Sequence, residues 1–410
     1  MVELLLKKEQ DIDTPYGELP IGFSTGAAHP FSPEGQLERL KALAETTTPK
    51  RVPLEINLWT WKQVEELKTN TRFQALLIQH KQRGGKLIFH SPPPEKDQSH
   101  SHPTFDPTDP QTLNRFQSLK QLAMSFQVEY VVFHPYWFKK PEDLVTLWAS
   151  SNSSQDKIAH SVTPAIEAAD IRQLRWMTAE ALKQFILLGA RAHVDLGHLL
   201  SLLNVGAAPE TVAKVFRELC QLNPIGFHVS DVVSDYQNGQ AVQSGRHAPV
   251  SEISDPIKEK LLAYMLSTIR TKLPQAPITI ESPVSPTKLN EIFGRNGSKE
   301  ATTSSNATLE YWLIMAFYLS VAESNDLREE TVRASHSIAI LKKALKLADE
   351  ILDFVPAGPD SLHKKIELLS QAREMMKRLT LVKLISEEYQ NTISLIKILE
   401  NFLQDFETNN

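Results

Sequence analysis

The sequence predicts an α/β protein, a (β/α)8 TIM barrel followed by an all-helical C-terminal extension. Between residues 20 and 295, short apolar runs rich in Val, Ile and Phe alternate with stretches of helical periodicity. Eight such runs occur, and repeated strand–helix alternation implies parallel strands joined by right-handed crossovers. Eight units over about 275 residues match the size of a closed barrel. An open doubly wound sheet is the alternative that the pattern leaves open.

The eight predicted strands are short and rich in β-branched and aromatic residues. In chain order they are IGFST (21–25), VPLEINL (52–58), KLIFH (86–90), EYVVFH (129–134), TPAIE (163–167), RAHVDL (191–196), IGFHVS (225–230) and PITIE (277–281). Between them lie segments with apolar residues at i, i+3, i+4 and i+7, the spacing of an amphipathic helix. These predicted helices are 34–45, 112–126, 178–190, 209–222 and 256–273.

A change of character after the eighth run predicts a domain boundary. The segment 295–307 is polar and poor in apolar residues, which is typical of a linker or an exposed loop. We therefore predict a barrel domain over 18–295 and a helical region over 308–410, interrupted by PAGPD (356–360). The apolar faces of these helices are expected to pack on the barrel, on each other or on another subunit in a homo-oligomer.

The composition limits the partners and cofactors. The 410 residues include 44 basic and 49 acidic ones, and the net charge of −5 gives no electrostatic bias toward nucleic acid or anionic membranes. Cys220 is the only cysteine in the sequence, so neither a disulfide within the chain nor a thiolate metal cluster can form. The first residues lack the features of a signal peptide, and no apolar run reaches the ~18 residues of a membrane span. We expect a cytoplasmic protein without a membrane segment.

Six consecutive predicted strands end in an imidazole or a carboxylate. In a barrel of this kind the active site forms at the C-terminal ends of the strands. Imidazole and carboxylate are donors that Zn, Mn and other divalent metals accept, and crowded carboxylates repel one another unless a cation compensates. The pattern therefore predicts a divalent-metal site. Its candidate residues are His90, His134, Glu167, Asp195 with His198, His228 with Asp231, and Glu281, joined by Arg246 and His247 from the loop after the seventh strand.

Each of these residues taken alone also has a purely structural explanation. Asp195 has the position of a helix N-cap, and His198 that of a surface histidine. A single structural histidine, however, gives no reason for the neighbouring strands to end in the same way. The prediction of a metal site therefore depends on the whole set of residues and not on any one of them. We expect Asp231 and Arg246 to orient the ligands rather than to bind the metal.

Seven short motifs resemble the xylose isomerase-like TIM barrels, a superfamily that includes endonuclease IV (AP endonuclease family 2) and many sugar phosphate isomerases and epimerases. The resemblance covers roughly residues 20 to 295 and depends on the order of the motifs. They are IGFSTGAA, FHSPPP, FHP, AIEAA, VDLGH, FHVSD and TIES.

The resemblance to endonuclease IV implies up to three metals. A first would be held by His90, His134 and Glu167, and a third would fall to His198 and His247. Glu167 would bridge to the second, held by Asp195, His228 and Glu281. This chain departs from the endonuclease in the loop after the seventh strand, where the endonuclease motif Asp-Arg-His reads GRH here, with Gly245 in place of the aspartate. The third position therefore lacks a carboxylate unless Asp231 or Asp235 substitutes.

The sugar-converting members imply a smaller site. They use only the quartet that corresponds to Glu167, Asp195, His228 and Glu281, and this quartet is complete here. One divalent metal would then polarise a carbonyl and a hydroxyl group, while Glu167 and Glu281 transfer the proton between adjacent carbons.

Three classes of function remain. The sequence narrowly favours an isomerase or epimerase acting on a sugar or sugar phosphate. Across the classes of function we expect one to three divalent ions, of Zn or Mn. The alternative is an endonuclease IV-like phosphoesterase, in which metals clamp a phosphoester. The third is a binding barrel without catalysis, against which the complete quartet argues. Because the chain is acidic overall, we expect a small substrate rather than duplex DNA, in a pocket partly closed by the loop 91–110.

Overall fold

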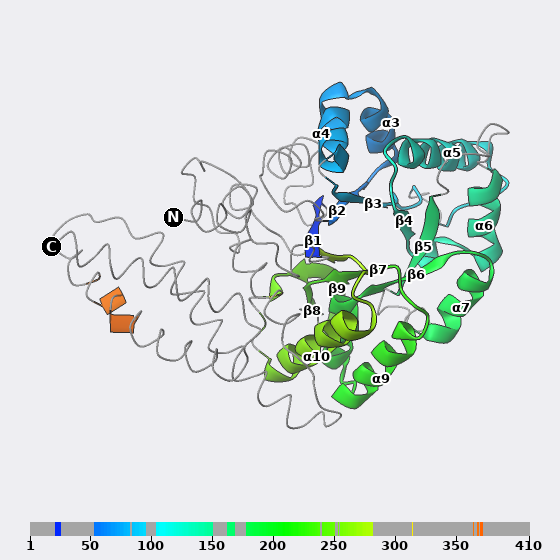
Figure 1. Ribbon diagram of the computed structural model, residues 1–410. Coiled ribbons are helices and arrows are strands. Elements are labelled where there is room, and N and C mark those ends of the chain that lie inside the picture. Colours follow the sequence, from blue (N-terminus) through cyan, green and yellow to red (C-terminus); the bar gives the residue numbers. More distant parts are fainter. Residues whose placement is uncertain are drawn as a thin grey trace, which may run out of the picture. The chain divides into compact units, whose positions relative to one another are not determined.

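The computed structural model describes residues 21–25, 53–82, 84–95, 104–150, 162–168, 178–237, 240–250, 253 and 255–281, with single residues at 314, 364, 367, 368, 370 and 371. Within these residues, eight parallel strands close into a barrel (Figure 1). The predicted barrel is confirmed, and the open sheet is wrong. The helical extension predicted over 308–410 falls almost entirely outside the described residues.

Every barrel strand lies where the sequence predicts one, to within a residue or two at each end. Buried parallel strands form near-continuous apolar runs, which explains why they are easy to find. The strands are β1 (Ile21–Ser24), β2 (Pro53–Asn57), β3 (Lys86–His90), β4 (Tyr130–Phe133), β5 (Thr163–Ala168), β6 (Arg191–Asp195), β7 (Gly226–Val229) and β10 (Ile278–Ile280). Around the barrel their order is β1-β10-β7-β6-β5-β4-β3-β2.

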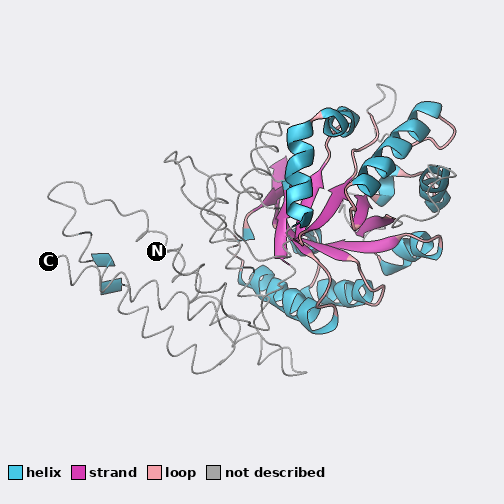
Figure 2. Cartoon of the chain, turned by 45° about the horizontal axis from the view of Figure 1, so that its top comes forward, coloured by secondary structure: helices cyan, strands magenta, loops and turns pink. Residues whose placement is uncertain are grey.

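Helices connect the strands, and those that precede β7 lie around the outside of the ring (Figure 2). Local capping fixes where several begin: Thr60 forms a capping box with Gln63, and Asp109 accepts from the backbone N–H groups of Gln111 and Thr112. The helices are α3 (Trp61–Thr69), α4 (Thr71–Gln82), α5 (Pro110–Ser125), α6 (Pro141–Ser150), α7 (Ala179–Leu187), α8 (Leu196–Ser201), α9 (Pro209–Cys220) and α10 (Pro256–Lys272).

A β-hairpin replaces the loop that the sequence predicts after the seventh strand. β8 (Asp231–Gln237) pairs antiparallel with β9 (Gln240–Ala248). The Asn-Gly pair at 238–239 between two alternating segments is the sequence signal that favours such a hairpin. The register sets Val232 opposite His247, which brings His247 back toward the end of β7.

The chain divides into two compact units. One comprises Asp13–Pro249 and Leu273–Ser304 and contains all eight barrel strands. The other comprises Met1–Ile12, Val250–Lys272 and Ser305–Asn410, and it includes α10. The boundaries 18–295 and 308–410 stay predictions.

Gly226 allows a close approach between β7 and the side chain of Tyr130 on β4. A Cβ atom at residue 226 would overlap the Tyr130 hydroxyl group and would lie 3.1 Å from Cδ2 of His193. Both neighbours are buried, and the Tyr130 hydroxyl has no hydrogen-bond partner among the described residues. Glycine is therefore required here by space, because protein interiors are close-packed.

The variant Gly226→Ala is expected to lower the free energy of unfolding by roughly 1–3 kcal/mol, because an extra methyl group forces packed neighbours apart. Adding Tyr130→Phe should recover part of this loss, since the hydroxyl oxygen is the nearest atom to the new methyl group. Chemical denaturation of the two single variants and the double variant measures the effect. A Gly226→Ala protein as stable as the parent would contradict the packing described here.

Candidate metal centre

The candidate site lies at the C-terminal end of the barrel, where six neighbouring strands each supply a side chain. Alternate residues of a strand share one face, so the inward face continues to the last residue of each strand. All of these side chains are buried except that of His134, which is intermediate. The six residues are His90 on β3, His134 after β4, Glu167 on β5, Asp195 on β6, His228 on β7 and Glu281 after β10.

The first group of possible ligands consists of His90, His134 and Glu167. Their ligand atoms all lie within 4.8 Å of one another. Oε2 of Glu167 is 3.3 Å from Nε2 of His90 and 3.4 Å from Nδ1 of His134. The two imidazole rings are 4.9 Å apart between centroids. This is the first position that the resemblance to endonuclease IV implies.

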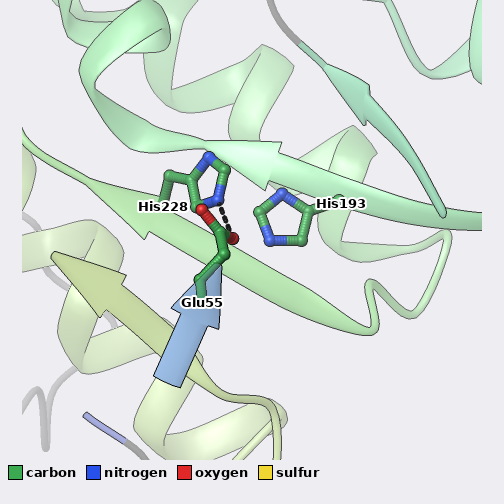
Figure 3. A group of neighbouring side chains, drawn as sticks. All are labelled: Glu55, His193 and His228. Carbon is green, nitrogen blue, oxygen red and sulfur yellow. Dashed lines mark hydrogen bonds and ion pairs between the residues drawn. The ribbon is translucent and has the colours of Figure 1, made fainter. Parts of the chain in front are cut away.

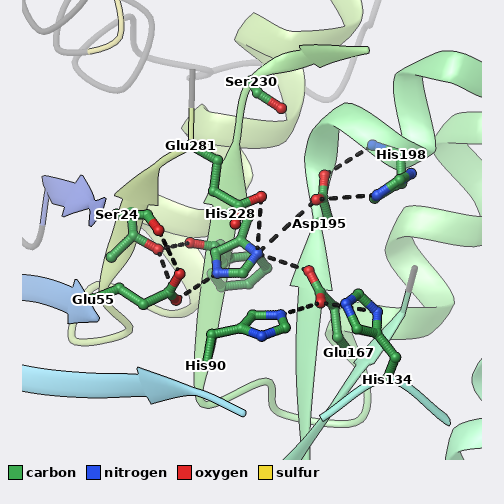
Figure 4. Close-up of polar contacts among 12 residues, drawn as sticks. Ser24, Glu55, His90, His134, Glu167, Asp195, His198, His228, Ser230 and Glu281 are labelled. Atoms are coloured by element: carbon green, nitrogen blue, oxygen red, sulfur yellow. Dashed lines mark hydrogen bonds and ion pairs between the residues drawn. The ribbon is translucent and has the colours of Figure 1, made fainter. Parts of the chain in front are cut away.

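The second group shares Glu167 and adds Asp195 and His228 (Figure 4). Nδ1 of His228 lies 2.7 Å from Oε1 of Glu167, 3.4 Å from Oε2 of Glu281 and 4.0 Å from Oδ2 of Asp195. Within the quartet of Glu167, Asp195, His228 and Glu281, the three carboxylates therefore all approach the same ring nitrogen, Nδ1 of His228. The two oxygens of Glu167 face different groups: Oε2 faces His90 and His134 of the first, and Oε1 faces His228 of the second.

The third group consists of Asp195, His198 and His247. Nε2 of His198 is 3.7 Å from Oδ2 of Asp195, and the rings of His198 and His247 are 5.4 Å apart between centroids. The carboxylate of this group is Asp195. Asp195 is also the N-cap of α8, because its Oδ1 accepts the backbone N–H of His198 at 2.8 Å. The structural and the functional interpretations of this residue are therefore compatible.

The donors present fit a divalent cation. Oδ2 of Asp195 and Nδ1 of His134 are buried and have no hydrogen-bond partner among the described residues. Unsatisfied buried polar atoms are costly, and cations that these atoms could approach would remove the cost. The set contains only nitrogen and carboxylate oxygen donors, which suit zinc or manganese.

The electrostatics show an excess of buried negative charge. Burial raises the pKa of Glu281, and the carboxylates of Glu55, Asp195 and Glu167 raise it further, to about 8 despite the opposing charge of His228. Burial also opposes the ionisation of Glu167, but the positive charge of His228 and the hydrogen bonds from His228 and His90 outweigh it and hold its pKa well below the ordinary value. A bound cation would compensate the carboxylates that repel one another here.

The same surroundings shift the pKa values of the four histidines in different directions. Burial lowers the pKa of His134 well below its ordinary value and also lowers that of His247. For His90, the hydrogen bond and the charge of Glu167 overcome the effect of burial and raise the pKa. For His228, the carboxylates of Glu281, Glu55 and Glu167 overcome it and hold the pKa well above 6.5.

Of the two residues expected to orient the ligands, Asp231 and Arg246, the structure describes the side chain of Asp231 alone. Asp231 is buried at the start of β8, and its Oδ1 accepts the backbone N–H of Val232 at 2.8 Å. Arg246 belongs to β9, but its side chain lies outside the described part of the structure. The same holds for the side chain of Asp235. Their roles stay predictions.

Two buried polar residues of the barrel interior were missed by the sequence analysis. Glu55 and His193 lie next to His228, and all three are 0% exposed (Figure 3). Each is located two residues before a strand's last residue, Glu55 before Asn57 and His193 before Asp195. The available signal was a charged or polar residue on the same face as the strand end, one layer deeper in the barrel.

Neither a protein-family model nor a curated protein matches the chain. Solved structures do match. The structure of AsfvAP:AG aligns at 12% identity over 73% of this chain and 99% of that chain, with a TM-score of 0.45. The 3-keto-D-glucoside 4-epimerase YcjR from E. coli aligns at 12% identity over 67% and 97%, with a TM-score of 0.41. Endonuclease IV from Thermus thermophilus aligns at 16% identity over 65% and 93%, also with a TM-score of 0.41.

The helices in the described part of the chain were also compared with the requirements of a membrane span. None of them combines the necessary length with sufficient hydrophobicity.

Proposed function

We propose that the barrel is a divalent-metal-dependent phosphoesterase whose metals occupy neighbouring positions that share Glu167. The observation that carries this proposal is the arrangement of the Glu167 carboxylate. Its Oε2 faces His90 and His134, while its Oε1 faces His228. A carboxylate between two groups of histidines is suited to bridge two metals, whereas a mononuclear site has no use for His90 and His134.

The chemistry follows from this arrangement. Divalent ions held there would stabilise the negative charge that develops on a phosphoester and would make water a better nucleophile. Glu167, Asp195 and His228 are buried and serve to bind and orient. The side chains of His198 and His247 are 12% and 25% exposed, so they border the side from which a substrate can enter.

An isomerase or epimerase acting on a sugar or sugar phosphate is the second candidate. The sequence narrowly favours it, and the placement of two carboxyl groups supports it. Oε1 of Glu167 and Oε2 of Glu281 lie 2.7 and 3.4 Å from the same nitrogen, Nδ1 of His228. Two carboxyl groups that share one site are the arrangement expected of a proton-transfer pair. This candidate needs one metal, whereas the phosphoesterase needs two or three.

The deciding experiment is elemental analysis of protein purified without chelator, combined with activity assays. Two or three metal equivalents with hydrolysis of phosphomonoesters or diesters support the phosphoesterase. One equivalent with interconversion of sugars or sugar phosphates supports the isomerase. Intact and abasic duplex DNA are included at about 150 mM salt, where the net charge of −5 leads us to expect little binding. Metal-free protein that takes up no metal on reconstitution would exclude both candidates.

The double variant His90→Ala/His134→Ala separates the two candidates. If Glu167 bridges two ions, the variant is expected to lose one metal equivalent and to lose hydrolysis by roughly 10²-fold or more, because one half of the metal clamp is gone. The measurement is metal content per chain beside turnover of a chromogenic phosphoester.

His80→Ala is the matched control, because His80 lies on α4 and its Nε2 contacts the backbone oxygen of Lys86, outside the site. Its metal content should equal that of the parent. An unchanged metal count in the double variant would favour the mononuclear isomerase.

A further inference from the structure

Glu55 is a fully buried carboxylate in the interior of the barrel, beneath the candidate metal site. Its Oε1 accepts a hydrogen bond from Oγ of Ser24 at 2.8 Å, and its Oε2 lies 2.6 Å from Nε2 of His228. The hydroxyl of Thr279 is 3.5 Å from the same Oε2. A buried carboxylate is costly unless it is paired and hydrogen-bonded, and Glu55 is both. A group without exposed surface does not touch a substrate, so any role must act through its neighbours.

The two ring nitrogens of His228 face different environments. Nε2 faces Glu55, and Nδ1 faces the carboxylates of Glu167 and Glu281 at 2.7 and 3.4 Å. Both oxygens of Glu55 are engaged, Oε1 by the hydroxyl of Ser24 and Oε2 by Nε2 of His228 at 2.6 Å, which is a hydrogen-bond distance. A carboxylate only accepts, so the proton of this bond is on Nε2. Nδ1 is then the nitrogen that a metal would bind, in place of a proton.

We propose that Glu55 is a positioning residue that accepts the Nε2 proton of His228 and thereby directs Nδ1 toward the metal-binding carboxylates. The inference rests on the proposed metal site. Histidines that bind metals commonly donate the other ring N–H to a carboxylate, which fixes the tautomer and the ring orientation and strengthens the ligand. Ser24 holds the second oxygen of Glu55, so β1 and β2 together determine the orientation of His228.

His193 raises one competing explanation. Ligand atoms of Glu55, His193 and His228 lie within 4.8 Å of one another, so these residues could themselves hold an ion. The 2.6 Å separation of Glu55 and His228, however, is a hydrogen-bond distance. His193 packs its ring against that of His228 at 4.2 Å between centroids and 63° between planes, and neither of its ring nitrogens makes a hydrogen bond to the described residues. Glu55 is therefore bonded to His228 and not to His193.

The test is a zinc titration of the full chain, stripped of metal, against a chromogenic chelator. Glu55→Gln keeps the shape of the side chain and one acceptor oxygen but removes the charge. It is expected to weaken zinc binding roughly 10- to 100-fold. Ser24→Ala removes only the bond to Oε1 and should give a smaller loss in the same direction. Cobalt(II) provides a second readout, because its absorption bands depend on ligand strength and geometry and should shift in Glu55→Gln.

Two further variants complete the design. Glu65→Gln alters an exposed glutamate on α3 and should leave both readouts unchanged. His193→Leu should retain every zinc equivalent, and loss of one would overturn the proposal in favour of a buried ion. Parental affinity and spectrum in both Glu55→Gln and Ser24→Ala would also overturn it. A parent chain that binds no zinc refutes the proposed function instead, so the two failures are distinguishable.

Discussion

Replacing Glu167 by glutamine is expected to remove metal from both positions that share this residue and to lower phosphoesterase turnover by about 10³-fold or more. The carboxylate supplies one oxygen to the group with His90 and His134 and the other to the group with His228. Glutamine has nearly the same shape but carries no charge, and its amide nitrogen does not bind a cation. Several kcal/mol of transition-state stabilisation are lost with the metals, and each 1.36 kcal/mol corresponds to a factor of about 10 in rate.

The measurement is metal content per chain together with turnover. Glu180→Gln is the matched control, since Glu180 is exposed in the first turn of α7 and forms an ion pair with the surface residue Lys183. Its metal content and turnover should equal those of the parent. If Glu167→Gln retained every metal equivalent, Glu167 would not be a ligand and the bridging arrangement would be excluded.

The fold was predictable because its strands are buried on both faces. Each forms an apolar run bounded by polar residues, and the helices α5, α7, α9 and α10 overlap the predicted helices 112–126, 178–190, 209–222 and 256–273. The hairpin β8–β9 was missed because its strands, which lie outside the barrel, mix polar and apolar residues and form no continuous apolar run. Its Asn-Gly pair is a signal for the turn, but the pattern on either side is weak.

The site residues at the ends of the strands were predictable, whereas the polar residues one layer deeper in the barrel were not. Parallel strands bring their C-terminal ends together, so the last inward residue of each strand could be assigned to a common site without knowing any distance. Glu55 and His193 lie one layer deeper, where a sequence alone does not show whether a polar residue is paired. The resemblance already paired His247 with His198, but only the structure adds Asp195 to this group and shows that the register of β8 and β9 places His247 there.

Removing the metal is expected to destabilise the barrel as well as to inactivate it. Glu167, Asp195 and Glu281 are buried within a few ångströms of His228, together with Glu55, so negative charge outweighs positive charge in the interior. A cation that binds only the folded state stabilises it by about 4 kcal/mol when its free concentration is about 1,000 times the dissociation constant. The melting temperature of the chelator-treated protein should therefore fall on the order of 8 °C and should recover when zinc or manganese is returned.

The variant Glu167→Gln shows whether this effect comes from the proposed site. It is expected to melt at nearly the same temperature with and without added metal, because the shared ligand is absent. Glu180→Gln should retain the full metal-dependent increase. Calorimetry or thermal shift at a fixed scan rate measures the parent and both variants. A metal-dependent increase of parental size in Glu167→Gln would show that the ion binds elsewhere in the chain, since loss of a ligand at the binding site must reduce the linkage between binding and folding.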